Sequence, residues 1–436
     1  MVTIPSTVAA TRLDNAGNRH YALALLVVVG IFAWMDRNVL AILLESIRAE
    51  FDFSDTQLGL LGGVAFGVFY ASLGLPVAWL ADRYSRRNII AASLTLWSAM
   101  TAVCGLATGF ASLFLARVGV GVGEAGASPP SQSLISDLFP PGRRGFALGV
   151  YYLYIPLGFV AGFLFGGWLN EYFEWRTAFV VVGLPGVLVA AVVRLTLREP
   201  RRGLSEGGAR VAGAPSVMAT CQYIWSRRSL RHLPLAGALH GVGAFAAAVW
   251  LPSYFIRAYG LSVGEVGTWM AAAYGISGVA GVLAGGYLAD WLVNRTGDAR
   301  WYPRFCAAAI MAGTPFAVLL FATASLPVAI FALFVTTFFT NAFLGPVTAV
   351  MQGLAGLRRR AVVAALYLFL VNLVSTGLGP LAVGVASDLF STRYGPASLR
   401  YALMLIVVVS GIWAAVHFLL AARTLRADLA AASEPS

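Results

Sequence analysis

The segment His20–Glu45, HYALALLVVVGIFAWMDRNVLAILLE, decides the predicted fold class of the chain. It is apolar along almost its whole length, and Asp36 and Arg37 lie near its centre. A helix rises about 1.5 Å per residue, so roughly 20 apolar residues cross the hydrocarbon core of a bilayer. The segment is therefore predicted to be a membrane-spanning helix with two charged side chains at membrane depth.

Similar apolar segments continue to the end of the chain and fall into two sets of six. The first set is His20–Glu45, Leu58–Leu80, Asn88–Ala107, Leu113–Ile135, Gly145–Leu169 and Ala178–Leu197. The second set is Leu233–Ile256, Val263–Ala289, Cys306–Thr323, Val328–Val350, Ala361–Ala386 and Leu399–Ala421. We therefore predict an all-α membrane protein with twelve transmembrane helices in two six-helix bundles, 20–197 and 233–421. A polar tail (1–19), a linker (198–232) and a second tail (422–436) complete the chain.

The composition supports a membrane protein and excludes a nucleic-acid-binding one. The 436 residues are 59% hydrophobic and only 11% charged, with a mean hydropathy of +0.79, whereas soluble domains are about 25% charged. The net charge of +11 comes from arginines in short clusters between apolar segments, and the chain has no lysine. Such clusters act as topology signals, so we expect membrane lipids, and no nucleic acid, as partners.

The distribution of arginines predicts the orientation. With both termini in the cytoplasm, the expected outer loops hold only Arg48, Arg176, Arg257, Arg393 and Arg400, and nearly all other arginines lie inside. The absence of lysine is typical of a GC-rich bacterial genome, which places the protein in a bacterial inner membrane. Residues 1–19 are polar and lack the apolar core of a signal peptide, so the first membrane helix is expected to direct targeting.

The linker has two parts with different compositions. Residues 201–208 are rich in glycine and arginine, and residues 215–225 have the pattern of a short amphipathic helix. Trp225, Arg227 and Arg228 would hold such a helix on the inner membrane surface. A solvated linker is an equally good interpretation.

The two halves contain similar motifs in the same order. Leu80-Ala81-Asp82-Arg83 ends the second predicted helix, and Leu288-Ala289-Asp290-Trp291 ends the eighth. A shift of 217 residues carries the segment 167–173, with Gly167 and Glu171, onto 384–390, with Gly384 and Asp388. Two similar bundles with a site between them are what a rocking transporter needs.

Four charged side chains lie at membrane depth: Asp36 and Arg37 in the first predicted helix, and Arg117 and Glu124 in the fourth. Each costs about 2.5–3.5 kcal/mol in a membrane, so such residues normally face a cavity or a partner. Their depths allow Arg37 to meet Glu124, and Asp36 to meet Arg117. We expect a network of zero net charge that binds substrate and lines a central cavity; mutual neutralisation with a purely structural role is the alternative.

Protons are the coupling ion that this network favours. Asp36 and Glu124 are the candidates, because a carboxylate that changes partners as the cavity opens also changes its affinity for a proton. No cofactor is expected. The chain lacks a P-loop lysine, and its three cysteines have no metal-ligand spacing.

Two other signals have simpler explanations. The pattern G-x-G-x-x-G at Gly121–Gly126 lacks the strand that a dinucleotide site needs and lies within the membrane. Small residues at four-residue spacing instead indicate close helix packing; they are Gly119, Gly123, Gly158, Gly162 and Gly166.

The segment Ala78–Arg87, AWLADRYSRR, resembles the signature of the major facilitator superfamily between helices 2 and 3, although Ala78 and Ser85 replace its usual glycines. The resemblance implies that Asp82, Arg83 and Asp137 form a latch between the bundles when the inner side is closed. Arg86 and Arg87 complete the motif, with membrane anchoring as their alternative role. Asp290 repeats the start of the motif in the second half.

A closer resemblance is to the Spinster branch of that superfamily, in particular its bacterial members. It is carried by Met35-Asp36-Arg37, by Asp82-Arg83, by RVGVGVGEA from Arg117 to Ala125, and by Ser128-Pro-Pro. The resemblance covers essentially the whole chain. It implies alternating-access transport of an amphiphile with a charged head, of the lysophospholipid or sphingosine-phosphate class.

The second half offers few charges but several polar and aromatic side chains for the other wall of the cavity. The candidates are His240, Tyr254, Tyr274, Asn341, Tyr367 and Asn372, for which ordinary packing is the alternative. Export of a small organic anion or drug is the competing function, and a non-transporting receptor or scaffold is the competing class. A membrane enzyme is not expected, because no nucleophile–base or metal constellation is present. We expect a monomer.

Overall fold

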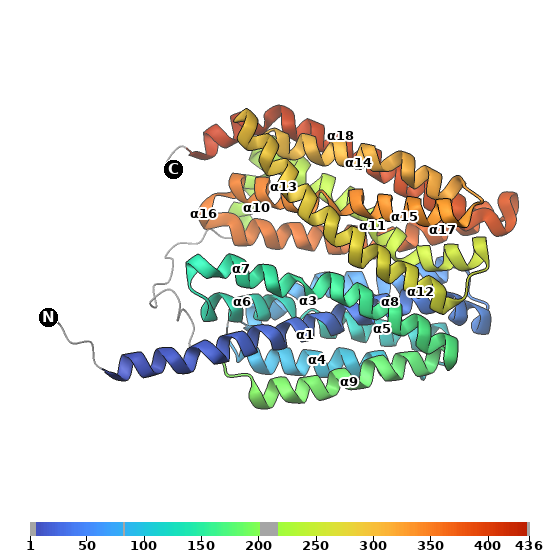
Figure 1. Ribbon diagram of the computed structural model, residues 1–436, viewed down its shortest axis with the longest axis horizontal. Helices are drawn as coiled ribbons and strands as arrows, with labels where there is room; N and C mark the ends of the chain where they lie inside the picture. Colours follow the sequence, from blue (N-terminus) through green and yellow to red (C-terminus); the bar gives the residue numbers. More distant parts are fainter. Residues whose placement is uncertain (1–5, 82, 201–216, 434–436) are drawn as a thin grey trace.

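The structure is a computed structural model that describes residues 6–81, 83–200 and 217–433, and its helices form two bundles (Figure 1). The first bundle contains α1 (Ser6–Phe51), α2 (Asp55–Gly59), η1 (Leu60–Val64), α3 (Ala65–Ala81), α4 (Arg86–Cys104), α5 (Phe110–Glu124), α6 (Ser128–Leu138), α7 (Pro141–Tyr152), α8 (Tyr154–Tyr172) and α9 (Trp175–Thr196). α10 (Val217–Ser226) connects it to the second bundle.

The second bundle contains α11 (Arg228–Tyr259), α12 (Val263–Ala272), η3 (Ala273–Gly278), α13 (Val279–Thr296), α14 (Trp301–Ala322), α15 (Leu326–Asn341), α16 (Leu344–Leu370), η4 (Val371–Leu378), α17 (Gly379–Tyr394), η5 (Gly395–Ala397) and α18 (Ser398–Ser433). All twelve predicted membrane segments are helical, so the predicted fold class is confirmed. Three of the crossings contain a π-helical stretch (η1, η3 and η4) where the two bundles meet.

Ten stretches of the described residues are long and apolar enough to span a membrane. The last of them, Val362–Ala431, holds two helices joined by η5 and therefore accounts for two crossings. α4 falls outside this set because its first turn contains Arg86, Arg87 and Asn88.

Several helices are longer than predicted, and two of them extend into the predicted tails. α1 begins at Ser6 and α18 continues to Ser433, where polar tails were expected. The alanine- and leucine-rich sequence after Ala421 favours a helix. It is also held in place, because Arg426 lies 3.1 Å from Asp298.

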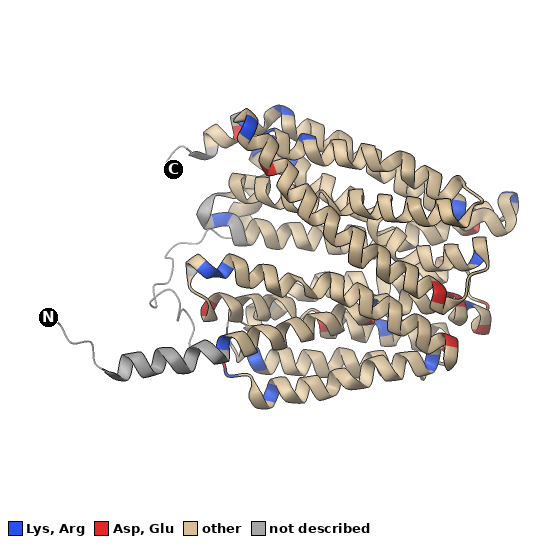
Figure 2. Cartoon of the chain, in the orientation of Figure 1, with Lys and Arg blue, Asp and Glu red and all other residues tan. Residues whose placement is uncertain are grey.

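The start of α1 and the end of α18 lie at the same end of the molecule, which we call the terminal end (Figure 1). The opposite end, with the turns α1–α2, α11–α12 and α17–α18, is the distal end. Charged residues gather at both ends and are sparse between them (Figure 2). This is the pattern of a protein that presents an apolar belt to a bilayer.

The two bundles pack tightly towards the distal end. There α8 lies against α12, α17 against α2, and α1 against α11. One apolar core is shared by both bundles and includes Leu44 and Ile47 from α1 and Trp250 and Phe255 from α11. Two further cores lie within single bundles. The structure is therefore closed at its distal end.

α10 lies in the part of the linker where an amphipathic helix was one of the two interpretations. Trp225 is 73% exposed, and the Arg231 guanidinium lies 5.7 Å from its ring centroid. The Tyr223 hydroxyl donates a 2.8 Å hydrogen bond to the Leu354 carbonyl, which fixes the helix to the second bundle. Its contact with the membrane surface stays a prediction.

Candidate functional site

The four charged residues predicted at membrane depth come together in the first bundle. α1 contributes Asp36 and Arg37, and α5 contributes Arg117 and Glu124. Asp36, Arg117 and Glu124 are at most 2% exposed, and the Arg37 side chain is 14% exposed. Close approach of α5 to its neighbours makes this possible. A Cβ at Gly121 would lie 2.7 Å from the Phe66 carbonyl oxygen, and one at Gly123 would lie 2.7 Å from the Trp97 amide.

The predicted contact between Arg37 and Glu124 is present. Arg37 Nε lies 2.7 Å from Glu124 Oε2. Three aromatic rings surround the guanidinium, with centroids at 5.1 Å (Trp34), 4.4 Å (Phe66) and 4.7 Å (Tyr70). Cation–π attraction to several rings stabilises a buried guanidinium, so Arg37 is fixed on both its edge and its face.

Asp36 and Arg117 do not form the expected pair in this conformation. The Thr101 hydroxyl donates a 3.1 Å hydrogen bond to Asp36 Oδ2, which directs the carboxylate towards α4. Asp36 Oδ1, Glu124 Oε1, and Nε and Nη1 of Arg117 have no hydrogen-bond partner among the described residues. Leaving such groups unpaired in a buried site is costly. The described residues therefore provide hydrogen-bond partners for only part of the polar atoms of these four side chains.

A small cavity of about 40 Å³ lies between the two bundles beside these charges. Arg37 and Arg117 form part of its wall from the first bundle. The wall from the second bundle is neutral and consists of Phe245, Ala248, Val249 and Thr376. One charged and one neutral wall were predicted, but these four residues were not. Small and apolar residues carry no sequence signal that separates a cavity wall from ordinary packing.

The six residues predicted for the second wall lie near the cavity or in the second bundle, and none lines the described cavity. The Tyr274 ring stacks on that of Phe159, a cavity-lining residue of the other bundle, with centroids 4.4 Å apart. His240 is 7% exposed, and its Nε2 lies 3.0 Å from the Thr340 carbonyl oxygen. The Tyr254 hydroxyl donates a 2.9 Å hydrogen bond to the Leu320 carbonyl, in the shared core.

The remaining three are engaged within the second bundle. Asn341 and Asn372 donate hydrogen bonds to the carbonyl groups of Thr337 and Leu368, one turn earlier in their helices. Tyr367 packs on α11, where a Cβ at Gly237 would lie 2.5 Å from its hydroxyl oxygen. Their role in substrate binding stays a prediction for a conformation in which the bundles are further apart.

The predicted latch residues lie at the terminal end and contact their own bundles. Arg86 is 1% exposed, and its Nη1 donates a 2.5 Å hydrogen bond to Asp137. Its main-chain amide donates a 2.8 Å bond to Glu199 Oε1, and the Ser85 hydroxyl binds the other oxygen of Glu199. Burial acts to raise the pKa of Glu199, but these hydrogen bonds and the Arg86 guanidinium outweigh it and lower the pKa below its usual value.

The other latch residues contact residues that are close to them in the sequence. The Arg83 guanidinium lies 3.6 Å from the Trp79 ring centroid, and Arg87 donates a 3.3 Å bond to its neighbour Asn88. In the second bundle, the Tyr302 hydroxyl donates a 2.8 Å hydrogen bond to Asp290. Asp82 lies outside the described residues. A latch between the bundles at the terminal end stays a prediction for the opposite conformation.

At the distal end, an ion-pair cluster that the sequence did not predict joins the bundles. Arg257, at the end of α11, donates to Glu45 of α1 at 2.6 Å and to Asp55 of α2 at 2.8 Å. Asp55 also accepts a 2.6 Å hydrogen bond from Ser387. Charged residues that flank apolar helices on the expected outer side were the available signal, but nothing in the sequence indicated which of them pair.

The five glycines at four-residue spacing have the packing role that was predicted. A Cβ at each would lie within 2.9 Å of a neighbouring helix: Gly119 near Met100, Gly123 near Trp97, Gly158 near Trp34, Gly162 near Asn38 and Gly166 near Ile42. In the described part of the chain, no group of three or more His, Cys, Asp or Glu side chains could hold a metal ion.

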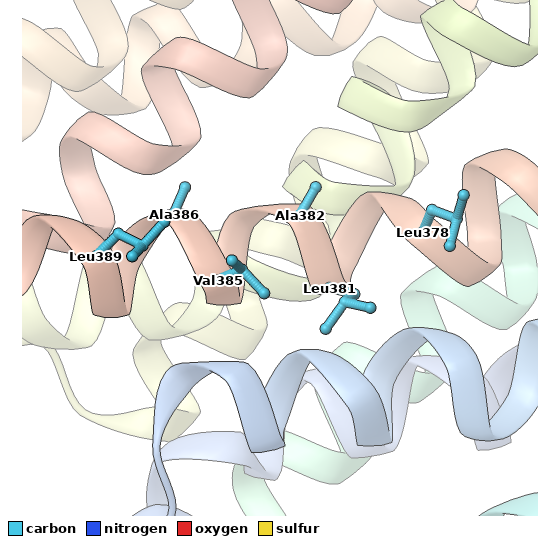
Figure 3. Close-up of a pocket in the computed structure, with 6 residues that line it drawn as sticks. All are labelled: Leu378, Leu381, Ala382, Val385, Ala386 and Leu389. Atoms are coloured by element: carbon cyan, nitrogen blue, oxygen red, sulfur yellow. The ribbon is translucent and has the colours of Figure 1, made fainter.

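A larger, open concavity of about 420 Å³ runs along α17 and is lined by Leu378, Leu381, Ala382, Val385, Ala386 and Leu389 (Figure 3). All six side chains are apolar; five come from α17, and Leu378 is the last residue of η4. The concavity offers no polar group to orient a substrate, and its place on an apolar span fits a surface that bilayer lipid covers. The small cavity between the bundles is therefore the candidate site.

The family model described as Major Facilitator Superfamily matches residues 26–380. An MFS-type efflux pump of Mycolicibacterium smegmatis is 32% identical, over 95% of this chain and 96% of the relative. The sphingosine-1-phosphate transporter SPNS2 of Danio rerio is 27% identical, over 90% and 82%. A D-galactonate transporter of Escherichia coli is 26% identical, over 93% and 96%.

Solved structures, among them the following, are similar along almost the whole chain. One is the crystal structure of a bacterial homologue of the human lysosomal transporter Spinster, in an inward-facing and unoccupied conformation. It matches with a TM-score of 0.86 and 29% sequence identity, and covers 95% of this chain and 98% of that chain. These relatives and this fold are those of transporters rather than enzymes.

Proposed function

This chain belongs to the major facilitator superfamily and is similar to its Spinster members, and on that premise we propose that it moves an amphipathic anion across the membrane by proton-coupled alternating access. The substrate class is a lysophospholipid or a sphingolipid phosphate. The transporter acts as a monomer in a bacterial inner membrane, with both termini in the cytoplasm.

The observation that carries the proposal is Arg117. Its side chain is 2% exposed and lines the cavity between the bundles, with two guanidinium nitrogens that have no hydrogen-bond partner among the described residues. A planar guanidinium with free donors suits a phosphate or carboxylate. Glu124 accepts a hydrogen bond from Arg37 and none from Nε or Nη1 of Arg117. Arg117 is thus the cation that an anionic head group would meet.

Aromatic side chains beside the charges fit the apolar part of such a substrate. The Trp34 ring lies 4.9 Å from Phe159 and 6.5 Å from Phe245 of the opposite bundle, and Phe159 stacks on Tyr274. These rings form an apolar surface between the bundles. An alkyl chain buried there would gain about 25 cal/mol for each Å² of apolar surface removed from water.

The cavity volume implies that the bundles move. About 40 Å³ holds no more than a water molecule or two, so an amphiphile enters only when the bundles separate. The distal end is sealed by the shared core and by Arg257. If the arginine distribution places that end outside, this is an inward-facing state with a nearly closed site, which agrees with the state described for the similar crystal structure.

Proton coupling is assigned to Asp36 and Glu124. Each has one oxygen within a hydrogen-bonded contact and one without a partner among the described residues. An anionic substrate on Arg117 would compete with these carboxylates for positive charge. Uptake of a proton by either carboxylate would restore neutrality, because a bound anion would otherwise give the two carboxylates and two arginines a net negative charge within the membrane.

Transport of a smaller organic anion or a drug is the second candidate function. The same arginines would bind a carboxylate, and the relatives include a D-galactonate transporter and an efflux pump. The aromatic surface beside Arg37 favours the amphiphile, since a sugar acid would gain little from it.

A flux measurement in proteoliposomes separates these candidates. Purified protein is tested with labelled lysophospholipid, with D-galactonate and with a cationic dye, alongside Arg117→Gln and the control Arg194→Gln on the exposed surface of α9. We expect lysophospholipid flux that Arg117→Gln reduces at least about tenfold. Flux of D-galactonate alone would replace the proposed substrate by the second candidate, and flux of neither anion would reject the proposal.

A further inference from the structure

At the distal end, a carboxylate of the second bundle binds the start of a helix in the first. Asp388 of α17 accepts hydrogen bonds from the main-chain amides of Asp55 at 3.1 Å and Thr56 at 2.8 Å. These amides are the first of the helical span that begins at Asp55 and continues through η1 into α3. A helix N-terminus carries a partial positive charge and amides without a partner in the helix. Asp388 accepts hydrogen bonds from such amides across the boundary between the bundles, and its negative charge is attracted to the positive helix end.

The same arrangement occurs with the bundles exchanged. Glu171 of α8, in the first bundle, accepts a 3.1 Å hydrogen bond from the main-chain amide of Gly264, in the first turn of α12. Trp168, one turn earlier in α8, donates a 3.1 Å bond to Thr268 of α12. A carboxylate of each bundle thus binds a helix start of the other.

Internal symmetry relates the two contacts. The shift of 217 residues that aligns the two halves carries Glu171 onto Asp388. The helix starts correspond as well, because Ser54 with Gln57 and Ser262 with Glu265 form matching capping boxes. Both the carboxylates and the helix starts that they bind therefore correspond between the two halves. Such a correspondence is not expected of a chance surface contact.

Glycines one turn before each carboxylate permit the approach. A Cβ at Gly384 would lie 2.2 Å from the Asp55 carbonyl oxygen, and one at Gly167 would lie 2.9 Å from the Val263 carbonyl oxygen. Gly167 and Gly384 are themselves related by the same shift. A Gly-x-x-x-Glu/Asp pair on each of α8 and α17 thus brings backbone and carboxylate together at the seam.

We propose that Glu171 and Asp388 are the paired distal latches of the transport cycle, each closing one seam between the bundles by capping a helix of the opposite half. This inference rests on the proposed alternating access. The latches are released when the distal end opens, and the two amides at α2 and the one at α12 then bind water.

The two latches have different strengths. Asp388 is half-buried, accepts two amides and lies beside Asp55, which Arg257 binds. Glu171 is exposed and accepts a hydrogen bond from one amide. The first residue of α12 is Val263, which has no carboxylate to bind an arginine as Asp55 does at the start of α2. The Asp388 contact is therefore expected to hold more tightly than the Glu171 contact.

Cysteine labelling from outside the cell tests the latches without any substrate. Ala41 lines the cavity and is 2% exposed, so Ala41→Cys reports opening of the distal end. It is placed in a Cys221→Ser background, because Cys104 and Cys306 are buried. A membrane-impermeant maleimide is added to intact cells. We expect slow labelling of this reporter, about tenfold faster labelling with Asp388→Asn and about threefold faster labelling with Glu171→Gln.

Two further variants make the test specific. Glu265→Gln changes a carboxylate of α12 that, among the described residues, accepts a hydrogen bond from its own helix start alone, and should leave the rate unchanged. Gly384→Ala keeps every charge but prevents close approach, and should also accelerate labelling. Wild-type rates in folded Asp388→Asn and Glu171→Gln proteins would overturn the proposal. If the latch variants label faster but the protein does not transport the anion, the latches stand and the proposed function is rejected. If the protein transports the anion but the latch variants label at the wild-type rate, the proposed function stands and the latches are rejected.

Discussion

Arg37 Nε and Glu124 Oε2 are 2.7 Å apart, although 87 residues separate them in the sequence. The contact joins α1 to α5 within the first bundle, beneath the cavity that faces the second bundle. Glu124 engages Arg37, whereas Nε and Nη1 of Arg117, a residue that lines the same cavity, have no hydrogen-bond partner among the described residues. One arginine is therefore held in place by the protein, and the other is the one that we propose binds the anion.

Replacing Arg37 tests this division of roles. Arg37→Ala leaves the Glu124 carboxylate buried without its partner, and breaking a buried pair costs about 3–5 kcal/mol. We expect transport to fall at least about a hundredfold, measured as initial flux into proteoliposomes. Arg37→Lys should recover part of it, and Arg194→Ala, on the exposed surface, should have no effect. Undiminished flux in Arg37→Ala would show that the pair is structural only.

Phe66 contacts both cations and offers a second test. Its ring centroid lies 4.4 Å from the Arg37 guanidinium and 5.6 Å from that of Arg117, and the side chain is 1% exposed. Phe66→Leu keeps most of the volume but removes the cation–π attraction, which is about 0.5–2 kcal/mol. We expect KM for the anion to rise about threefold to thirtyfold, while Phe66→Tyr stays near wild type. An unchanged KM in Phe66→Leu would remove Phe66 from the site.

The lowered pKa of Glu199 predicts a pH dependence of stability at the terminal end. Its stabilising contribution is fully present above the unfolded pKa, about 4.3, and is lost as the pH falls through the lower pKa of the folded protein. Glu199→Gln should therefore lower the free energy of unfolding by about 1–3 kcal/mol near neutral pH. The difference from wild type should persist down to about pH 5 and shrink below about pH 4.

Thermal melting of the detergent-solubilised protein across this pH range checks the Glu199 prediction. Glu174→Gln, with an exposed side chain, serves as the control and should melt as the wild type does. A difference that grows towards acid pH would contradict the direction of the shift.

The fold could be predicted from the sequence because a bilayer leaves few alternatives. Apolar segments of about 20 residues must be helices there, and the twelve predicted segments are all helical. Helix ends were less predictable, as α18 shows, since helix propensity continues past the apolar span. The π-helical stretches η1, η3 and η4 were not predicted, because they arise where the two bundles meet.

The site was predicted in part, for a physical reason. A charge at membrane depth is costly enough to stand out in the sequence, and depth along two helices was sufficient to pair Arg37 with Glu124. Asp36 instead meets Thr101, a common residue that carries no such signal. The neutral wall with Phe245 and Val249, and the distal partners of Arg257, depend on how the bundles pack together, which a single sequence does not specify.

Proton-driven accumulation is the measurement that tests the central claim most directly, namely that charges lie within the membrane because a moving anion and proton need them. Labelled lysophospholipid uptake is followed in proteoliposomes with and without an imposed pH gradient, for wild type, Asp36→Asn and Glu124→Gln. We predict that the gradient drives accumulation by the wild type. Neutralising the coupling carboxylate should abolish the response to the gradient while leaving exchange of substrate across the membrane. Accumulation that ignores the gradient in the wild type, or that responds equally in both variants, would contradict the account.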